Sequence, residues 1–483
     1  MTFNSWEFLI FYPIVAALYF LLPKRMKWPM LLIASYYFYA FYQAELLFLI
    51  VLTTVVSFFM SHLIERTEST AKRKIYLALT LTVCLGVLFF YKYFNFLSSS
   101  VAGIISIFGK ETPPLILDLV LPVGISFYTF QTLSYVIDVY RGEVKTEKNI
   151  FFYALFVSFF PQLVAGPIER PGNLIPQLKE AHKPERDNLI RGGKQMIVGF
   201  FKKICVADLV ATYVNAVYNS QGGATSLSVV LATLMFAVQI YCDFSGYTDI
   251  ATGCARIMGI KLMKNFDRPY SSTSIKEFWS RWHISLSGWF KDYLYIPLGG
   301  SRRSPVRNML NVFIVFLVSG LWHGANWTFV IWGALHGIYR VLGTLTVKKR
   351  DALLTKAGLS PTSRGVIAVR RVLTFILVSF AWVFFRANTI ADAFTLIGAL
   401  FTRHGSLASA LSFMQLDTVS ILLIIFSVAT MIILDRAVTY DEDDCSDILV
   451  KNGSFIYFIF VIMFVWLLLL SRGQDSTFIY FQF

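Results

Sequence analysis

Long apolar runs recur along this 483-residue sequence, and short clusters of Lys and Arg separate them. The first run covers residues 5–22, and PKRMKW at 23–28 follows it with three positive charges. A run of about 20 apolar residues can cross the hydrocarbon core of a bilayer as a helix. Basic clusters between such runs mark cytoplasmic loops. We therefore predict an all-α polytopic membrane protein whose N-terminus is extracytoplasmic.

Composition supports a membrane protein over other classes. Hydrophobic residues make up 56% of the chain and charged residues 15%, so apolar surface exceeds what a soluble core of this size would hide. The net charge of +14 lies in the clusters between apolar runs, which indicates membrane topology and argues against a nucleic-acid partner. The five cysteines have no metal-ligand spacing. We expect the lipid bilayer as a partner and no metal site.

The apolar segments predict about eleven transmembrane helices, with one to three short re-entrant or interfacial helices. We expect one membrane-embedded domain over 1–483, with N-terminal helices at 1–150, a motif-bearing core at 151–345 and C-terminal helices at 346–483. The segments outside the central motifs are 5–22, 28–43, 45–64, 75–97, 115–139, 150–165, 226–260, 372–386, 419–435 and 455–470. A long basic connection is expected at 348–371, and the terminal FIYFQF is expected to be interfacial or packed on the body.

Ionisable side chains interrupt two apolar segments of the core. In FFKKICVAD, Lys202 and Lys203 are expected to snorkel toward the membrane surface, and Asp208 to be capped or paired near a helix end. Asp243 and Tyr247 are four residues apart and share one face of a predicted helix. Because ionisable groups at membrane depth are costly, Asp208, Asp243 and Tyr247 are candidates for a functional site.

Residues 278–290, FWSRWHISLSGWF, carry Arg281 and His283. The Trp and Ser residues of this stretch recur at helical spacings, which predicts an amphipathic segment that lies at a membrane interface or dips into the membrane, and argues against a full span. After a break at YLYIPLGG, Arg302 and Arg303 form a basic loop. This loop either contacts phosphate groups or is a plain cytoplasmic loop of the positive-inside type.

A further histidine, His323, lies in an apolar stretch between LNVFIVFLVSGLW and GANWTFVIW. Gly320 and Gly324 flank it and would let another group approach closely. Apolar surroundings favour the neutral ring, which is the form that a general base needs. A lone buried histidine is usually structural, but His283 as a second candidate for the same depth favours function. For His336, near a predicted helix end, we expect a structural role.

Several motifs of this chain resemble the membrane-bound O-acyltransferase (MBOAT) family. Within that family they are most similar to the bacterial branch that O-acetylates alginate, peptidoglycan or other exopolysaccharides. The motifs are RWHISLSGWFKDYLYIPLGGSRR, SGLWHGANWTFVIWGALHG, QIYCDFSGYTDIA, FFPQLVAGPIER and the terminal FIYFQF. The resemblance implies a helical bundle around a central tunnel. It also implies that His323 is catalytic, that His283 lines the same funnel, and that Asp208 occupies a position important for activity.

The residues and the resemblance together lead to one leading hypothesis, acyl transfer from a thioester. The expected donor is acetyl-CoA, used as a substrate with no bound cofactor. His323 would accept the proton of the attacking hydroxyl, and His283 or Arg281 would hold the thioester or its oxyanion. The candidates for donor binding are Arg281, Trp322, Asp243, Tyr247, Arg302, Arg303 and Asp208.

The resemblance also implies partners and a location. The acyl group would pass through the bacterial cytoplasmic (inner) membrane to an extracytoplasmic SGNH/AlgJ-like acetyltransferase that acts with polysaccharide secretion and modification proteins. One alternative within the family is the transfer of D-alanyl or other acyl groups to teichoic acid or peptidoglycan. An alternative from another class is an ion or solute transporter, with the buried ionisable groups as its path.

Overall fold

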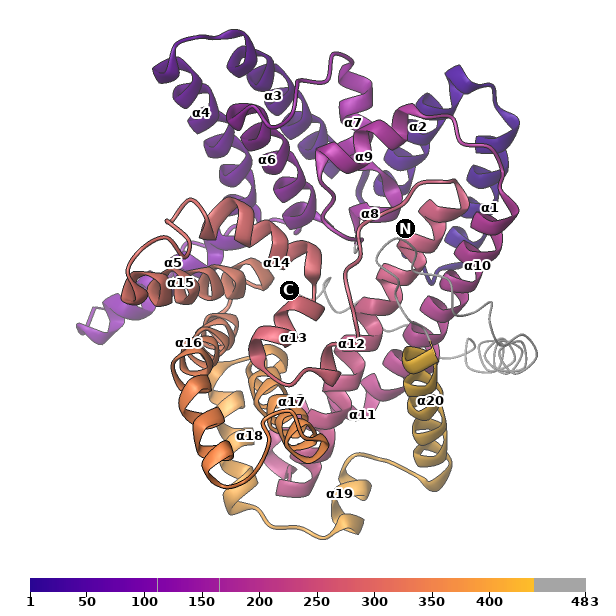
Figure 1. The fold of residues 1–483 in the computed structure, drawn as a ribbon. Helices are drawn as coiled ribbons and strands as arrows, with labels where there is room; N and C mark the ends of the chain where they lie inside the picture. The colour runs from indigo at the N-terminus through magenta and orange to yellow at the C-terminus, as the bar shows by residue number, and fades with distance from the viewer. Residues whose placement is uncertain (111, 165, 438–483) are drawn as a thin grey trace. The chain divides into compact units, whose positions relative to one another are not determined.

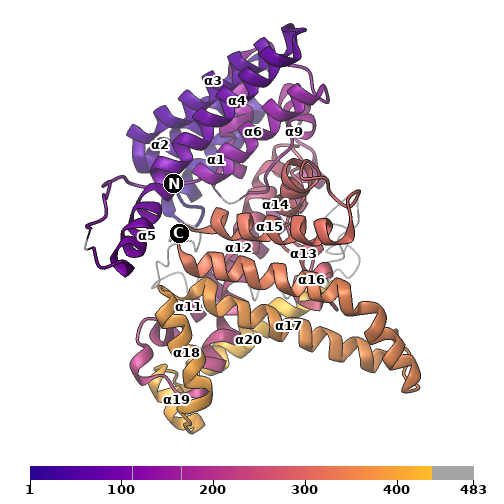
Figure 2. The ribbon, with the colours of Figure 1, turned by 90° about the vertical axis from the view of Figure 1, so that its left-hand side faces the viewer.

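A computed structural model gives the fold and describes residues 1–437 except 111 and 165 (Figures 1 and 2). Within these ranges, every regular element is a helix. The predicted apolar segment at 455–470 and the FIYFQF end lie outside the described residues. The chain divides into two compact units: Met1–Met196 with Thr248–Met263, and Ile197–Tyr247 with the described residues from Lys264 onward. The helix α12 (Ser226–Ile257) contributes residues to both.

The first unit contains the N-terminal helices. Helices α3, α4 and α6 lie side by side, and α2 packs against α7 (Figure 1). The bounds are α1 (Trp6–Leu21), α2 (Lys24–Gln43), η1 (Ala44–Leu46), α3 (Leu47–Arg66), α4 (Thr70–Leu88), η2 (Phe89–Tyr93), α5 (Phe94–Ile107), α6 (Ile125–Arg141), α7 (Ile150–Ser158), α8 (Phe160–Leu163), α9 (Pro171–Lys179) and α10 (Arg186–Phe200), of which the last four residues belong to the second unit.

The second unit contains the sequence motifs around the histidines. Helices α15, α16 and α17 lie one beside the next, and α13 packs against α16 (Figure 2). The bounds are η3 (Phe201–Asp208), α11 (Leu209–Tyr218), η4 (Gln221–Gly223), η5 (Pro269–Ser271), α13 (Ile275–Arg281), α14 (Ile284–Phe290), η6 (Lys291–Tyr295), α15 (Pro305–His323), α16 (Trp327–Lys356), α17 (Arg364–Arg386), α18 (Ile390–Thr402), α19 (Leu407–Phe413) and α20 (Thr418–Ala437).

Seven helical segments in the described part of the chain are long and apolar enough to cross a membrane. They are Ala44–Arg66, Thr70–Ile107, Ser226–Ile257, Pro305–His323, Trp327–Lys356, Arg364–Arg386 and Thr418–Asp435. Trp6–Leu21 and Ile390–Thr402 are shorter apolar helices. The predicted fold class, an all-α polytopic membrane protein, is confirmed. The total of about eleven spans and the central tunnel stay predictions.

Two predicted boundaries differ from the observed ones. The span expected at 115–139 is helical only from Ile125, because the preceding stretch contains Pro113, Pro114 and Pro122, which lack the backbone N–H of a helix. The basic connection expected at 348–371 is largely helical, since α16 continues to Lys356 and α17 begins at Arg364. Its Lys, Arg, Leu and Ala residues are good helix formers, so the helices extend past their apolar parts.

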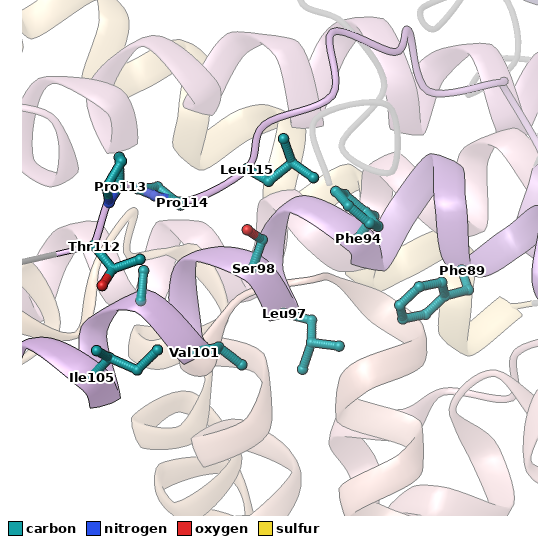
Figure 3. A pocket seen from close by; sticks show the side chains of 11 residues that line it. Phe89, Phe94, Leu97, Ser98, Val101, Ile105, Thr112, Pro113, Pro114 and Leu115 are labelled. Atoms are coloured by element: carbon teal, nitrogen blue, oxygen red, sulfur yellow. The ribbon is translucent and has the colours of Figure 1, made fainter.

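In the first unit, α5 and the extended segment at 112–115 enclose an apolar groove of about 340 Å³ (Figure 3). Leu97, Val101 and Ile105 of α5 line it, together with Thr112 and the residues that follow. Asn95 holds the extended segment in place, since its side chain donates to the Leu117 carbonyl at 2.9 Å and accepts from the Leu117 N–H at 2.8 Å. The lining contains none of the predicted site residues.

Two glycines allow α15 and α16 to pack backbone against backbone. A Cβ on Gly320 would lie 2.3 Å from the Phe329 carbonyl oxygen, and one on Gly333 would lie 2.4 Å from the Phe316 carbonyl oxygen. Any side chain at either position would push the helices apart, because such distances are far below van der Waals contact. The close approach expected at Gly320 is confirmed, and the approaching group is the helix α16. This crossing places the end of α15 against the start of α16.

Candidate active site

His283 lies at the break between α13 and α14, with φ 45° and ψ 54°. The stretch 278–290, for which we predicted an amphipathic segment, is therefore divided between two short helices that meet there. A ladder of backbone hydrogen bonds imposes the break, because the Ile284 N–H donates to the Asn265 carbonyl and the Asp267 N–H to the Arg281 carbonyl, both at 2.9 Å. A left-handed conformation is costly for a residue other than glycine and persists only where the surroundings enforce it.

The His283 side chain is fully buried and is held by Asn265. The distance from His283 Nδ1 to Asn265 Oδ1 is 3.0 Å. The same oxygen accepts from the Ser285 hydroxyl at 2.9 Å and from the Ser285 N–H at 3.4 Å. Burial lowers the pKa of His283 from 6.5 to about 3, so the ring is neutral near pH 7.

His323 is the last residue of α15, and its side chain is 2% exposed. The ring of Trp322 lies 5.0 Å from it between centroids, as does that of Trp332, and the Phe385 ring lies at 5.5 Å. Gly324 follows, and a Cβ there would lie 2.1 Å from the Phe329 ring. The sequence places His323 within one apolar stretch, and the structure places it at the turn between two helices.

The structure brings His283 and His323 together from separate parts of the chain. Their ring centroids lie 6.4 Å apart. Two further rings pack against His283: the ring centroid of Trp322 lies 5.9 Å from that of His283, and the centroid of Phe244 lies 4.7 Å from it. With this separation, both rings can reach a single hydroxyl or carbonyl group between them. Aromatic walls exclude water and so strengthen any electrostatic interaction inside the site.

A buried ion cluster joins Lys203 to two of the predicted site residues. Lys203 Nζ lies 2.7 Å from Asp208 Oδ1 and 2.8 Å from Asp243 Oδ1. Helix α12 approaches the backbone at Gly199 closely because residue 246 is a glycine. A Cβ at Gly246 would lie 2.8 Å from the Gly199 carbonyl oxygen. Tyr247 lies beside the cluster, with Lys203 Nζ 5.6 Å from its ring centroid.

The expectation that Lys202 and Lys203 snorkel is wrong, because both are 1% exposed. Each pairs with an aspartate instead, Lys202 with Asp435 at 3.5 Å. Asp435 also accepts from the Tyr241 hydroxyl at 2.6 Å. The expected pairing of Asp208 is confirmed. Buried charges need such partners, since water is excluded.

The three arginines predicted as site residues are more exposed than the histidines and the ion cluster. Arg281 pairs with Glu277 at 2.8 Å and donates to Ser271 Oγ at 3.3 Å, with its side chain 28% exposed. Arg302 and Arg303 lie exposed in the turn between η6 and α15. Both are therefore accessible to a soluble, charged ligand.

His336 lies within α16, and the prediction of a helix end there is wrong. Its Nδ1 accepts from Trp279 Nε1 at 3.2 Å, and the rings of Trp332 and Phe278 pack on it. This environment agrees with a structural role. Across residues 1–437, apart from 111 and 165, no group of three His, Cys, Asp or Glu side chains could hold a metal ion.

Asn265 and Trp332 are site residues that the sequence analysis missed. Asn265 lies eighteen positions before His283, in a polar stretch with no helical period to link the two. Trp332 lies in a motif quoted for the resemblance, yet only the glycine crossing of α15 and α16 shows that it faces His323. A search for polar residues near the histidine motifs would have included Asn265 without singling it out.

Comparison with known proteins identifies the family. The profile of the membrane-bound O-acyltransferase family matches residues 35–385. The chain belongs to the membrane-bound O-acyltransferase family. It is therefore an O-acyltransferase and a multi-pass membrane protein. The match includes both site histidines, the Lys203 cluster and Asn265.

The relatives of this chain are named for different acyl groups and different acceptor polymers. The probable alginate O-acetylase AlgI of Pseudomonas aeruginosa is 40% identical over 83% of this chain and 75% of its own length. The peptidoglycan O-acetyltransferase of Helicobacter pylori is 36% identical over 84% of this chain and 80% of its own. The teichoic acid D-alanyltransferase of Streptococcus thermophilus is 31% identical over 50% of this chain and 61% of its own.

Proposed function

We propose that this O-acyltransferase moves an acetyl group from cytoplasmic acetyl-CoA through the membrane, for O-acetylation of an extracytoplasmic polysaccharide such as alginate. The pair His283 and His323, buried 6.4 Å apart among aromatic rings, is the observation that carries the proposal. The relatives that match over most of the chain are named for O-acetylation, and this favours acetyl over D-alanyl as the group transferred.

The reaction follows from the chemistry of a thioester and a neutral imidazole. A hydroxyl oxygen of the acceptor attacks the thioester carbonyl, and the C–O bond forms as the C–S bond breaks. An imidazole of the pair takes the hydroxyl proton, which then passes to the departing thiolate to give free CoA. The sequence-based assignment gives this role to His323, and a general base contributes about a hundred- to ten-thousandfold.

Donor binding is proposed to use the exposed arginines of the turn. Arg302 and Arg303 are accessible, and guanidinium groups hold phosphates through paired hydrogen bonds. Acetyl-CoA carries phosphates at the end remote from its thioester, and we propose that the turn binds these phosphates while the thioester lies at the histidines. We propose that this face lies on the cytoplasmic side of a bacterial inner membrane and that the N-terminus lies outside, as the basic loops favour.

An extracytoplasmic serine transferase of the SGNH type is the proposed next acceptor. It would act with polysaccharide secretion and modification proteins and place the acetyl group on the polymer. The names of two relatives support the proposal, since they give alginate and peptidoglycan as the acetylated polymers. The alternative of ion or solute transport gives no account of two buried histidines close together at one site.

Purified protein in proteoliposomes tests the function with acetyl-labelled acetyl-CoA. The expected result is release of free CoA and transfer of label to a supplied hydroxyl acceptor, with loss of at least a hundredfold in His323→Ala. Movement of intact acetyl-CoA, or of an ion, without release of free CoA would instead support transport. Transfer of D-alanine from a carrier thioester, with acetyl-CoA inert, would support the teichoic acid branch.

A further inference from the structure

Asn265 fixes which nitrogen of His283 carries the proton. Its Oδ1 lies 3.0 Å from His283 Nδ1 and within 3.4 Å of the Ser285 backbone N–H. A backbone N–H can only donate, so the atom that faces it is the amide oxygen; the amide nitrogen would place two donors against each other. The same oxygen then requires a donor at His283 Nδ1. In a neutral ring the other nitrogen, Nε2, therefore carries a lone pair.

The backbone of the chain fixes this arrangement before any substrate binds. The Ile284 N–H donates to the Asn265 carbonyl, so the backbone and side chain of Asn265 hold both ends of the same short loop. His283 adopts a left-handed conformation with φ 45° as a result. Both side chains are at most 1% exposed, so water does not compete for the hydrogen bond. Such strain is maintained most often at functional sites.

The tautomer decides what His283 can do. A neutral imidazole with a lone pair at Nε2 accepts a hydrogen bond or a proton through that atom, but it has no N–H there to stabilise an oxyanion. Holding the thioester oxygen, one of the roles expected for His283 from the sequence, does not fit this tautomer. Accepting a hydrogen bond from an N–H or O–H group of the substrate does fit it.

We propose that Asn265 is a positioning residue of the acyl transfer, which holds His283 in the tautomer whose Nε2 accepts a hydrogen bond from the substrate. This inference rests on the proposed acyltransferase site. It leaves the role of base with His323, which faces the same site from α15, and makes His283 the group that orients the substrate through Nε2.

Other charged groups near His283 have partners of their own. Arg281, two residues earlier, pairs with Glu277, and Asp243 on α12 pairs with Lys203. His323 on α15 is the titratable ring that faces His283. A new carboxylate at position 265 is thus expected to act on His283 more strongly than these groups do.

Two substitutions of Asn265 separate its orienting role from a packing role. Asn265→Leu removes the acceptor oxygen. We expect kcat to fall about ten- to a hundredfold, as it does when partners that orient metal-binding histidines are removed, and the KM for acetyl-CoA to change little. Asn265→Asp keeps the acceptor oxygen and adds a charge that favours the imidazolium. We expect it to retain most activity at high pH and to lose it on the acid side, where the wild-type rate is still flat, because a nearby carboxylate raises a histidine pKa by about one to three units.

Asn311→Leu is the matched control. Asn311 is also buried, and its side chain donates to the Leu298 and Gly300 carbonyls, away from both histidines. We expect lower stability in this variant and an unchanged pH profile. The inference is overturned if folded Asn265→Leu keeps the wild-type kcat, or if the pH profile of Asn265→Asp matches the wild type. If His283→Ala and His323→Ala are both fully active, the proposed function itself fails, whatever Asn265 does.

Discussion

Replacing Lys203 with methionine tests whether the buried ion cluster holds the second unit together. The substitution keeps a side chain of similar length and removes the ammonium group that lies 2.7 Å from Asp208 and 2.8 Å from Asp243. All three side chains are at most 3% exposed, so water cannot replace the lost cation. Removing one partner of a buried pair costs about 3–5 kcal/mol. The free energy of unfolding of a typical protein is about 5–15 kcal/mol, so this loss is a large part of it.

Thermal unfolding in detergent, followed with a thiol-reactive dye, measures this loss. Cys84, Cys205, Cys242 and Cys254 are buried thiols, so the dye reacts with them as the protein unfolds. We expect Lys203→Met to melt well below the wild type. The exposed Lys349 provides the control Lys349→Met, which we expect to melt with the wild type.

A charge-balanced variant makes the result specific. Lys203→Met combined with Asp208→Asn and Asp243→Asn removes both carboxylate charges, and neutral replacement of a whole buried ion cluster is often tolerated. We expect this triple variant to recover much of the stability lost in Lys203→Met. The reasoning is refuted if Lys203→Met melts at the wild-type temperature, or if the triple variant is no more stable than the single one.

Three further predictions follow from contacts elsewhere in the structure. Burial raises the pKa of Glu169 from 4.5 to about 7, so between these pH values the folded state holds a proton that the unfolded state releases. The free energy of unfolding should therefore fall by up to about 3 kcal/mol as the pH rises from 4.5 to 7. Glu169→Gln should flatten this pH dependence in denaturation curves. Gly320→Ala should cost about 1–3 kcal/mol of stability and lower the transfer rate, because the added methyl group would meet the backbone of α16. Gly343→Ala, with open space around it, should do neither. Equal melting temperatures for the two variants would contradict the close crossing of α15 and α16. Arg302→Gln with Arg303→Gln should raise the KM for acetyl-CoA several-fold and leave kcat unchanged; an unchanged KM would assign both arginines to membrane topology alone.

The sequence predicts the helices better than it predicts the contacts between them. Apolar runs identify spans because every backbone group in a bilayer must find its partner within the helix. The same reasoning misplaces Lys203, since a lysine on an apolar helix either snorkels or pairs, and its partner Asp243 lies forty residues away. Only the tertiary structure shows which of the two occurs.

The site shows the same limit. His283 and His323 are recognisable from the sequence as polar groups in apolar surroundings. Asn265 is not, because its role comes from backbone pairing between two loops, which no periodicity records. The break at His283 is equally hidden, since a helical spacing of Trp and Ser residues continues across it.

Single-turnover transfer from acetyl-CoA by His283→Ala and His323→Ala tests the central claim, that these two histidines form one acyl-transfer site. The purified variants are first checked for folding by the thiol-dye melt and for donor binding by retention of labelled acetyl-CoA. The account predicts that both bind the donor, that each loses at least a hundredfold in rate, and that the double variant is little worse than either, because residues that act as a unit are not additive. Wild-type rates in either folded single variant would contradict it.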